Sequence, residues 1–189
     1  IQALHSAGFV VVVVTNQSVV ARGLTDLKGI EAIHARMERL LAEEGAFVDQ
    51  ISFCPHHPDK GFPEEVTAFK VECHCRKPKP GMLLDAASRF NIDCSNSWMV
   101  GDSERDILAG QAAGCRTIRV KTGHGLKPST VVPDAYVAGM HYILLTYQLT
   151  RLLTYALNER VRTYLSKTAE LGENAARHER CLCSRYALH

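Results

Sequence analysis

The stretch SWMVGDSERD, residues 97–106, decides the fold. Ser97–Val100 is a short apolar run typical of a strand, and Glu104–Ala113 has the pattern of a helix. Asp102 therefore lies at the carboxyl end of a strand, where a carboxylate can bind Mg²⁺ with help from water. Asp106 follows one helical turn later, where it can hold the loop in shape. The alternative is an N-capping Asp with helix-dipole charges.

Strands alternate with helices on both sides of this stretch. We expect further strands at Phe9–Val14, Val48–Phe53, Thr117–Val120 and Tyr136–Ala138, and helices at 27–45, capped by Thr25, and at 81–90. The Val-rich run at Phe9–Val14 predicts a strand buried on both faces. This order predicts an α/β domain, a three-layer Rossmann-like fold with a mostly parallel sheet. Functional groups should then lie at the carboxyl ends of the strands.

Composition and charge exclude several classes of protein. The chain is 46% apolar and 22% charged, with a net charge of +2, too balanced for a general nucleic-acid or membrane-surface binder. No run of eighteen apolar residues is present, which argues against a membrane span. The seven cysteines are an odd number, and four lie between Cys54 and Cys94. This pattern favours a reduced, cytoplasmic setting and a metal site over a disulfide framework.

A long polar loop, Cys54–Arg76, contains a candidate metal site. It holds a C-x-H motif and, after sixteen residues, a C-x-C motif. The candidate ligands are Cys54, His56, Cys73 and Cys75. Three thiolates and one imidazole suit tetrahedral Zn²⁺ and close its shell, so the site would be structural. Spacing alone leaves His57 and His74 open as the imidazole ligand, and unligated loop thiols are the alternative.

Two further segments could hold a phosphate group. Residues Thr15, Asn16, Gln17 and Ser18 follow the first strand, where hydroxyls, amides and free N–H groups can bind phosphoryl oxygens. A turn or helix cap is the competing interpretation. Arg76 and Lys77 are adjacent cations before a helix and can neutralise a phosphate, although most basic pairs are simply solvated.

The order of these motifs resembles a known superfamily. A strand ending in Thr, a later Lys-Pro and a strand ending in GDxxxD form the pattern of the haloacid-dehalogenase-like (HAD-like) phosphatases. With TNQS (15–18), ARG (21–23), CPHH…CxCRKPxPGM (54–82) and VGDSERD (100–106), the sequence resembles the D-glycero-D-manno-heptose 1,7-bisphosphate phosphatases, close to the histidinol-phosphate phosphatases. The resemblance covers roughly residues 1–138.

The resemblance implies hydrolysis of a sugar phosphate monoester through an aspartyl-phosphate intermediate, with Mg²⁺ as cofactor. The substrate implied is D-glycero-D-manno-heptose 1,7-bisphosphate, cleaved to the 1-phosphate, or alternatively histidinol phosphate. Thr15 would bind the transferring phosphoryl group, Lys77 would offset its charge, and Arg76 would recognise the sugar phosphate. The resemblance also places Asn16, Gln17 and Ser18 in the pocket, Asp102 and Ser103 at Mg²⁺, Asp106 as loop support, and Cys54, His56, Cys73 and Cys75 at Zn²⁺.

The sequence departs from this family in one respect. The family's nucleophile, its acid/base Asp and a second Mg²⁺ contact lie in a DxDGT segment on the first strand, and this chain contains no DxD. In the family that strand lies between the strands ending at Thr15 and Gly101. We therefore expect an N-terminal truncation that leaves two unpaired strand edges, a poorly folded polypeptide and negligible activity. The alternative is a binding module whose loop is held by zinc and which binds a phosphorylated ligand without cleaving it.

The phosphatase domain is predicted to span residues 1–140, with a helical extension at 141–189. The extension is an extended terminal helix or the start of a second domain, because phosphoheptose isomerases begin with a helix of this general look. A fused or partner isomerase is therefore one expectation, with no nucleic-acid or membrane partner, and either a monomer or a dimer. A second metal could be bound by His178, Cys181 and Cys183, but a frayed tail is expected. His124 is expected to have no role.

Overall fold

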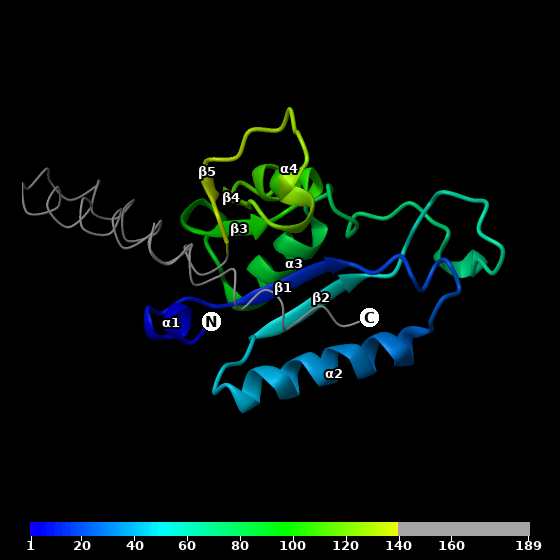
Figure 1. Cartoon of the computed structure of the whole chain (residues 1–189), viewed down its shortest axis with the longest axis horizontal. Helices are drawn as coiled ribbons and strands as arrows, with labels where there is room; N and C mark the ends of the chain where they lie inside the picture. The colour runs from blue at the N-terminus through cyan, green and yellow to red at the C-terminus, as the bar shows by residue number, and fades with distance from the viewer. Residues whose placement is uncertain (140–189) are drawn as a thin grey trace, which may run out of the picture. The chain divides into compact units, whose positions relative to one another are not determined.

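The computed structural model describes residues 1–139, and the predicted extension at 141–189 lies outside them. The strands are β1 (Val12–Asn16), β2 (Gln50–Cys54), β3 (Trp98–Gly101), β4 (Arg116–Val120) and β5 (Ala135–Val137). The helices are α1 (Gln2–Ser6), α2 (Leu27–Glu43), α3 (Gly81–Phe90) and α4 (Glu104–Ala112). Figure 1 shows this order along the chain. Across residues 1–139, no helix has the length and apolar character needed to cross a membrane.

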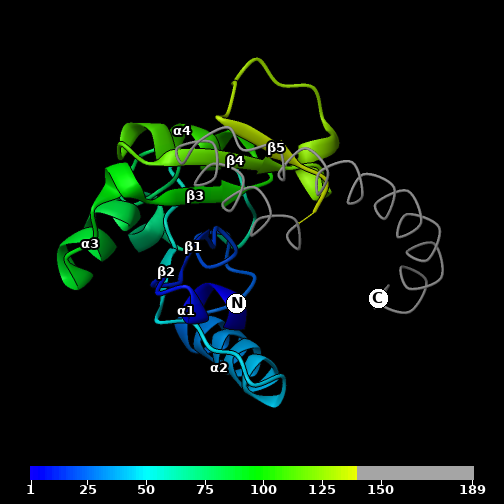
Figure 2. The ribbon, with the colours of Figure 1, turned by 90° about the vertical axis from the view of Figure 1, so that its left-hand side faces the viewer.

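All strand pairs are parallel, as the alternating order predicts, but the strands form two sheets. One sheet has the order β1-β2 and the other the order β3-β4-β5. Helix α3 packs against β1 and β2, while α4 packs against β3 and β4. Figure 2 shows β3, β4 and β5 side by side, with β1 and β2 as a separate pair. Within the part of the chain that the structure describes, nothing pairs with β1 or β3 on the edge that faces away from its own sheet.

The hydrogen bonds of β1 show which of its residues face this open edge. The N–H of Asp49 donates to the carbonyl of Val11, and the N–H of Gln17 donates to the carbonyl of Cys54. In a parallel pair, alternate residues direct both backbone groups to the same neighbour. Val12 and Val14 therefore direct theirs away from β2, toward the open edge.

Two local predictions need correction. The first strand begins at Val12 rather than Phe9, and it is half-buried rather than buried on both faces, because it belongs to a two-stranded sheet with an open edge. Helix α2 is capped by Asp26 rather than Thr25: the Asp26 carboxylate accepts the N–H of Gly29 at 2.8 Å. Asp26 satisfies one of the free N–H groups of the first turn.

Buried apolar residues of β4, β5 and α4 form part of the core. Ile118, Val120 and Val137 form a buried cluster, and Ile107 of α4 is fully buried. The register pairs Gly101 with Arg119, so the residues after β3 lie beside the end of β4.

Candidate active site

A cavity of about 620 Å³ lies at the carboxyl ends of β1, β3 and β4. The residues lining it are Thr15, Asn16, Lys77, Asp102, Ser103, Glu104, Arg105, Asp106, Arg119, His124, Lys127 and Pro128. Three separate sequence motifs thus meet in one place: the end of the first strand, the Lys-Pro segment and the GDxxxD segment. Carboxyl ends of parallel strands are where such groups are expected to meet.

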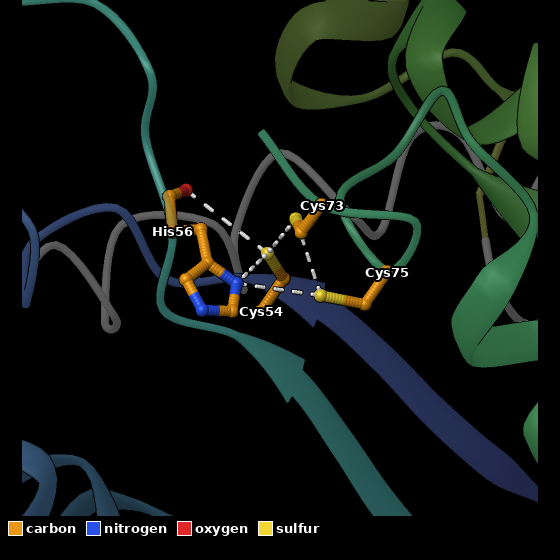
Figure 3. Close-up of side chains that lie close together, drawn as sticks. All are labelled: Cys54, His56, Cys73 and Cys75. Atoms are coloured by element: carbon orange, nitrogen blue, oxygen red, sulfur yellow. Dashed lines mark hydrogen bonds between the residues drawn. The ribbon is translucent and has the colours of Figure 1, made fainter. Parts of the chain in front are cut away.

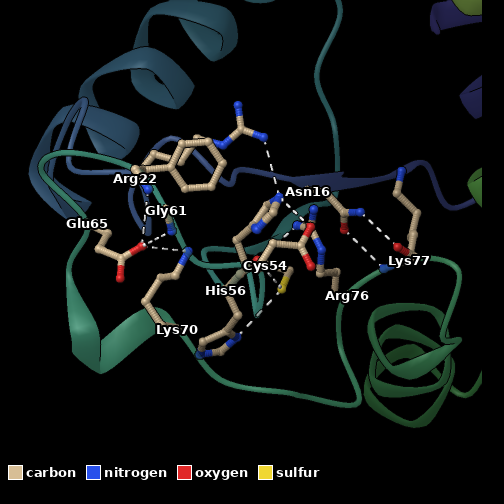
Figure 4. A network of polar contacts seen from close by, with 12 residues as sticks. Asn16, Arg22, Cys54, His56, Gly61, Glu65, Lys70, Arg76 and Lys77 are labelled. Atoms are coloured by element: carbon tan, nitrogen blue, oxygen red, sulfur yellow. Dashed lines mark hydrogen bonds and ion pairs between the residues drawn. The ribbon is translucent and has the colours of Figure 1, made fainter.

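Lys77 lines this cavity and is held by four contacts. Asn16 clamps its backbone: the side-chain amide donates to the Lys77 carbonyl at 3.0 Å, and the Lys77 N–H donates to Oδ1 of Asn16 at 3.0 Å (Figure 4). The ammonium donates to the carbonyl of Val14 at 2.7 Å and lies 2.7 Å from Oδ1 of Asp106. Lys77 therefore links the open edge of β1 to helix α4.

Asp106 orders the loop that follows β3. Its Oδ2 accepts the N–H of Ser103 at 3.0 Å and the hydroxyl of Ser103 at 2.9 Å. A side chain at Gly101 would collide with this carboxyl group. Although burial by itself raises the pKa of Asp106, the Lys77 ammonium and the Ser103 donors hold it below the ordinary value. Asp106 is thus a buried, ionised group with donors on both oxygens, as a loop-supporting residue requires.

Asp102 presents its carboxylate to the cavity from the end of β3. Oδ2 accepts the backbone N–H of His124 at 2.9 Å, and no residue in the 1–139 range donates to Oδ1. Gly123 has a positive φ of 52° and approaches so closely that a Cβ there would collide with the Asp102 carboxylate. A carboxylate with one free oxygen fits Mg²⁺, which takes one or two carboxylates together with phosphate and water.

The other predicted phosphate-binding residues divide into two groups. The hydroxyl oxygen of Thr15 accepts the amide of Gln17 at 3.2 Å, which leaves the hydroxyl proton of Thr15 available to a ligand. Gln17 and Ser18 do not line the cavity, and neither does Arg76. Arg76 instead donates to the carbonyl of His56 at 2.8 Å (Figure 4). The structure thus ties Arg76 to the cysteine-rich loop.

Sequence reasoning missed the contribution of the segment after β4. His124 and Lys127 of that segment line the cavity, although His124 was expected to have no role, and Arg119 lines it from β4 itself. Glu104 and Arg105, from the first turn of α4, line it as well. Residues that follow the carboxyl end of a parallel strand are candidates for a site. The segments KTGHGLK (121–127) and ER (104–105), however, have no spacing typical of a known motif.

The cysteine-rich loop brings four soft donors together. Figure 3 shows Cys54, His56, Cys73 and Cys75 directed at one another, with donor atoms that all lie within 4.8 Å. Nδ1 of His56 lies 3.6 Å from Sγ of Cys54 and 3.5 Å from Sγ of Cys75. Sγ of Cys73 lies 3.5 Å from Sγ of Cys54 and 3.3 Å from Sγ of Cys75. This donor set and its closeness fit a tetrahedral Zn²⁺.

The two other histidines of this segment lie elsewhere. His57 is buried, and its Nε2 lies 3.3 Å from Nη2 of Arg22. Burial, together with the nearby Arg76 and Arg22, lowers the pKa of His57, so it is neutral. The His74 side chain is 79% exposed and lies 3.8 Å from Asp85. Of the three candidates, the structure places only His56 among the cysteines.

Burial raises the pKa of the Cys54 and Cys75 thiols above the ordinary value. Cys73 differs: although burial acts in the same direction on it, hydrogen bonds with Cys75 and with the Arg76 backbone lower the pKa of Cys73 below the ordinary value. Without a cation, the Cys54 and Cys75 thiols are therefore neutral. A bound Zn²⁺ would reverse this, because its charge favours thiolates and displaces their protons.

Comparison with known proteins gives consistent results. Residues 74–141 match the family described as HAD-hydrolase-like. The chain is 46% identical over 127 residues to a D-glycero-β-D-manno-heptose-1,7-bisphosphate 7-phosphatase of Pseudomonas aeruginosa, covering 67% of this chain and 65% of the relative. It is 42% identical over 148 residues to the enzyme of that name from Vibrio cholerae, covering 75% of this chain and 77% of the relative.

A solved structure is similar as well. The D,D-heptose 1,7-bisphosphate phosphatase of B. bronchiseptica, crystallised with magnesium and phosphate, superposes with a TM-score of 0.64. It is 39% identical, and the match covers 82% of this chain and 79% of that one. The chain spans 65% of the length of the Pseudomonas aeruginosa relative.

Proposed function

Because this chain belongs to the family of D-glycero-β-D-manno-heptose-1,7-bisphosphate 7-phosphatases, we propose that it carries most of the catalytic pocket of such an enzyme. The reaction is hydrolysis of the 7-phosphate ester of the heptose bisphosphate, which leaves the 1-phosphate. The membership confirms the HAD-like α/β fold that the motifs predict. The observation that carries the proposal is the cavity in which Thr15, Lys77 and Asp102 meet.

The proposed reaction needs a nucleophilic carboxylate, and the 189 residues contain no DxD pair of the kind that supplies it in the family. In the first step, a carboxylate oxygen attacks phosphorus, the bond from phosphorus to the sugar oxygen breaks, and an acid protonates the departing oxygen. Water then attacks the aspartyl phosphate, which releases inorganic phosphate and restores the carboxylate. We assign the nucleophile and the acid to a DxDGT strand between β1 and β3. The open edges of these two strands support that assignment.

Residues of this chain do the positioning and the charge stabilisation. The Thr15 hydroxyl donates to the transferring phosphoryl group, and the Lys77 ammonium offsets the charge on its oxygens. Asp106 keeps Lys77 in place through the 2.7 Å ion pair. Asp102, with Ser103 beside it, would hold Mg²⁺, which would polarise the phosphoryl oxygens. Asn16 acts indirectly, by clamping the Lys77 backbone.

We further propose that Cys54, His56, Cys73 and Cys75 hold a structural Zn²⁺. The four donors leave no open coordination position, so this metal does not take part in catalysis. Its role is to close the loop between β2 and α3. Lys77 is only two residues beyond Cys75, so the metal also anchors the residue that contacts phosphate.

The test is an assay of the protein from the complete gene with Mg²⁺ and the heptose 1,7-bisphosphate. Phosphorus NMR of the product shows which phosphate leaves. We expect loss of the 7-phosphate, with much slower release from histidinol phosphate. Faster hydrolysis of histidinol phosphate would show that the protein prefers the substrate of the histidinol-phosphate phosphatases. Binding of the bisphosphate without phosphate release would identify a non-catalytic module.

A further inference from the structure

Arg119 is a buried cation whose partners all belong to the metal-binding side of the cavity. It is 3% exposed and lies in β4, opposite Gly101 in the register. In the described part of the chain, no carboxylate lies within ion-pair distance of its guanidinium, and all three hydrogen bonds of that group go to backbone carbonyls. Burying a charge costs free energy, so a buried arginine needs a role beyond packing.

The three acceptors of Arg119 converge on one residue, Asp102. Nε donates to the carbonyl of Asp102 itself at 3.3 Å. Nη2 donates to the carbonyls of His124 at 3.3 Å and Lys127 at 3.2 Å, the two ends of a short loop. That loop returns to Asp102, because the N–H of His124 donates to Oδ2 of its carboxylate.

The guanidinium therefore restrains Asp102 at two points. It holds the backbone directly, and it holds the carboxylate through the loop that donates to Oδ2. The planar fork of Arg suits this task, because its donors reach several acceptors in a fixed geometry. When Oδ2 of the Asp102 carboxylate is held in this way, Oδ1 keeps a fixed direction in which it can bind a cation. Groups that orient a metal ligand in this way raise metal affinity.

We propose that Arg119 is a positioning residue that orients the Asp102 carboxylate for Mg²⁺ through the loop at residues 123–127. This inference rests on the proposed function, in which Asp102 is a metal ligand. It adds to that site a residue that acts through the Asp102 backbone and through the loop that donates to Oδ2. Neither Lys nor Leu at this position can hold all three carbonyls at once.

The first measurement is amide hydrogen exchange of His124 in the protein from the complete gene. We expect Arg119→Leu to accelerate exchange at His124 about tenfold or more, and Arg119→Lys to do so less, because a single ammonium can keep only part of the network. The matched control is Arg116→Leu, an exposed arginine on the same strand, which should leave His124 unchanged.

The second measurement is Mn²⁺ affinity, followed by water-proton relaxation, in the protein from the complete gene. Arg119→Leu should weaken Mn²⁺ binding roughly 10- to 100-fold, and Arg116→Leu should not change it. Circular dichroism verifies that each variant is folded. If Arg119→Leu does not fold, Arg119→Lys decides the question by the same two measurements.

The outcomes separate this inference from the function on which it rests. Faster exchange at His124 with unchanged Mn²⁺ affinity would mean that Arg119 only stabilises the loop, and the proposal would be overturned. Unchanged exchange would overturn it as well. If the unmodified protein bound no Mn²⁺, the assignment of Asp102 as a metal ligand would itself be wrong, and the inference would end with it.

Discussion

The ammonium of Lys77 lies 2.7 Å from Oδ1 of Asp106, and both side chains are close to fully buried. The same ammonium donates to the carbonyl of Val14 on the open edge of β1. One side chain thus links β1 to the first turn of α4 at the point where phosphate is proposed to bind. Its charge is already balanced by Asp106, so it can be held in place before substrate arrives.

Replacement of Lys77 is expected to abolish most of the activity of the protein from the complete gene. Lys77→Met removes a preorganised cation from the transferring phosphoryl group, and loss of one such donor typically lowers kcat about 10²- to 10³-fold. The matched control is Lys79→Met, an exposed lysine two residues away that pairs with Glu72. Steady-state kinetics with the heptose bisphosphate provide the measurement. Equal losses in both variants would refute the assigned role of Lys77.

The 189-residue chain by itself is expected to release no phosphate from any sugar phosphate, even with Mg²⁺ present. It contains no DxD pair, and β1 and β3 do not pair in the part of the chain that the structure describes. A colorimetric phosphate assay, run beside the protein from the complete gene, measures this difference. Robust Mg²⁺-dependent turnover by the chain alone would disprove the view that the nucleophile lies outside it.

Elemental analysis is expected to find about one zinc per chain, as a single four-ligand site binds one ion. Cys73→Ser should lose the metal and lower the midpoint of thermal unfolding. Cys94→Ser is the matched control, because Cys94 lies outside the cluster. His57→Gln should keep the zinc, whereas His56→Gln should not. Retention of full zinc content by the Cys73 variant would show that the ligand assignment is wrong.

The start of helix α2 offers a local test of the structure. Asp26→Ala removes the acceptor of the Gly29 N–H and should lower the free energy of unfolding by about 1 kcal/mol. Thr25→Ala should cost less, because the Thr25 side chain is not the cap. Urea unfolding of the protein from the complete gene measures both variants. A larger effect at Thr25 would restore the cap predicted from the sequence.

Acid is expected to weaken the link between β4 and the segment before β5. Oδ2 of Asp134 accepts the hydroxyl and the N–H of Thr117, both at 2.7 Å, and these bonds lower the pKa of Asp134 below its ordinary 3.8. A carboxyl group with a lowered folded-state pKa stabilises the fold above pH 3.8 and loses that contribution as the pH falls through the folded value. The free energy of unfolding of Asp134→Asn should therefore fall less steeply over this range. Urea unfolding at several acidic pH values measures it, and equal slopes would contradict the expectation.

Local patterns in the sequence were sufficient for the elements and for several groups of the site. The run before Thr15 and the GDxxxD segment predicted strand ends, and the described strands are parallel as the alternation predicted. The spacing of Cys54, Cys73 and Cys75 indicated a metal cluster that the geometry fits. These predictions succeed because the pattern of a strand and the spacing of metal ligands can be read from one stretch of the chain.

Only the tertiary structure decided which side chains meet. It selected His56 over His57 and His74, directed Arg76 to the cysteine-rich loop, and brought Arg119 and His124 to Asp102. His56 and His57 differ by only one residue in their spacing from Cys54, so spacing does not choose between them. A buried arginine such as Arg119 is not marked by any local sequence pattern. The partners of these residues are set by long-range packing and strand pairing, which depend on the whole chain and not on any short stretch of it.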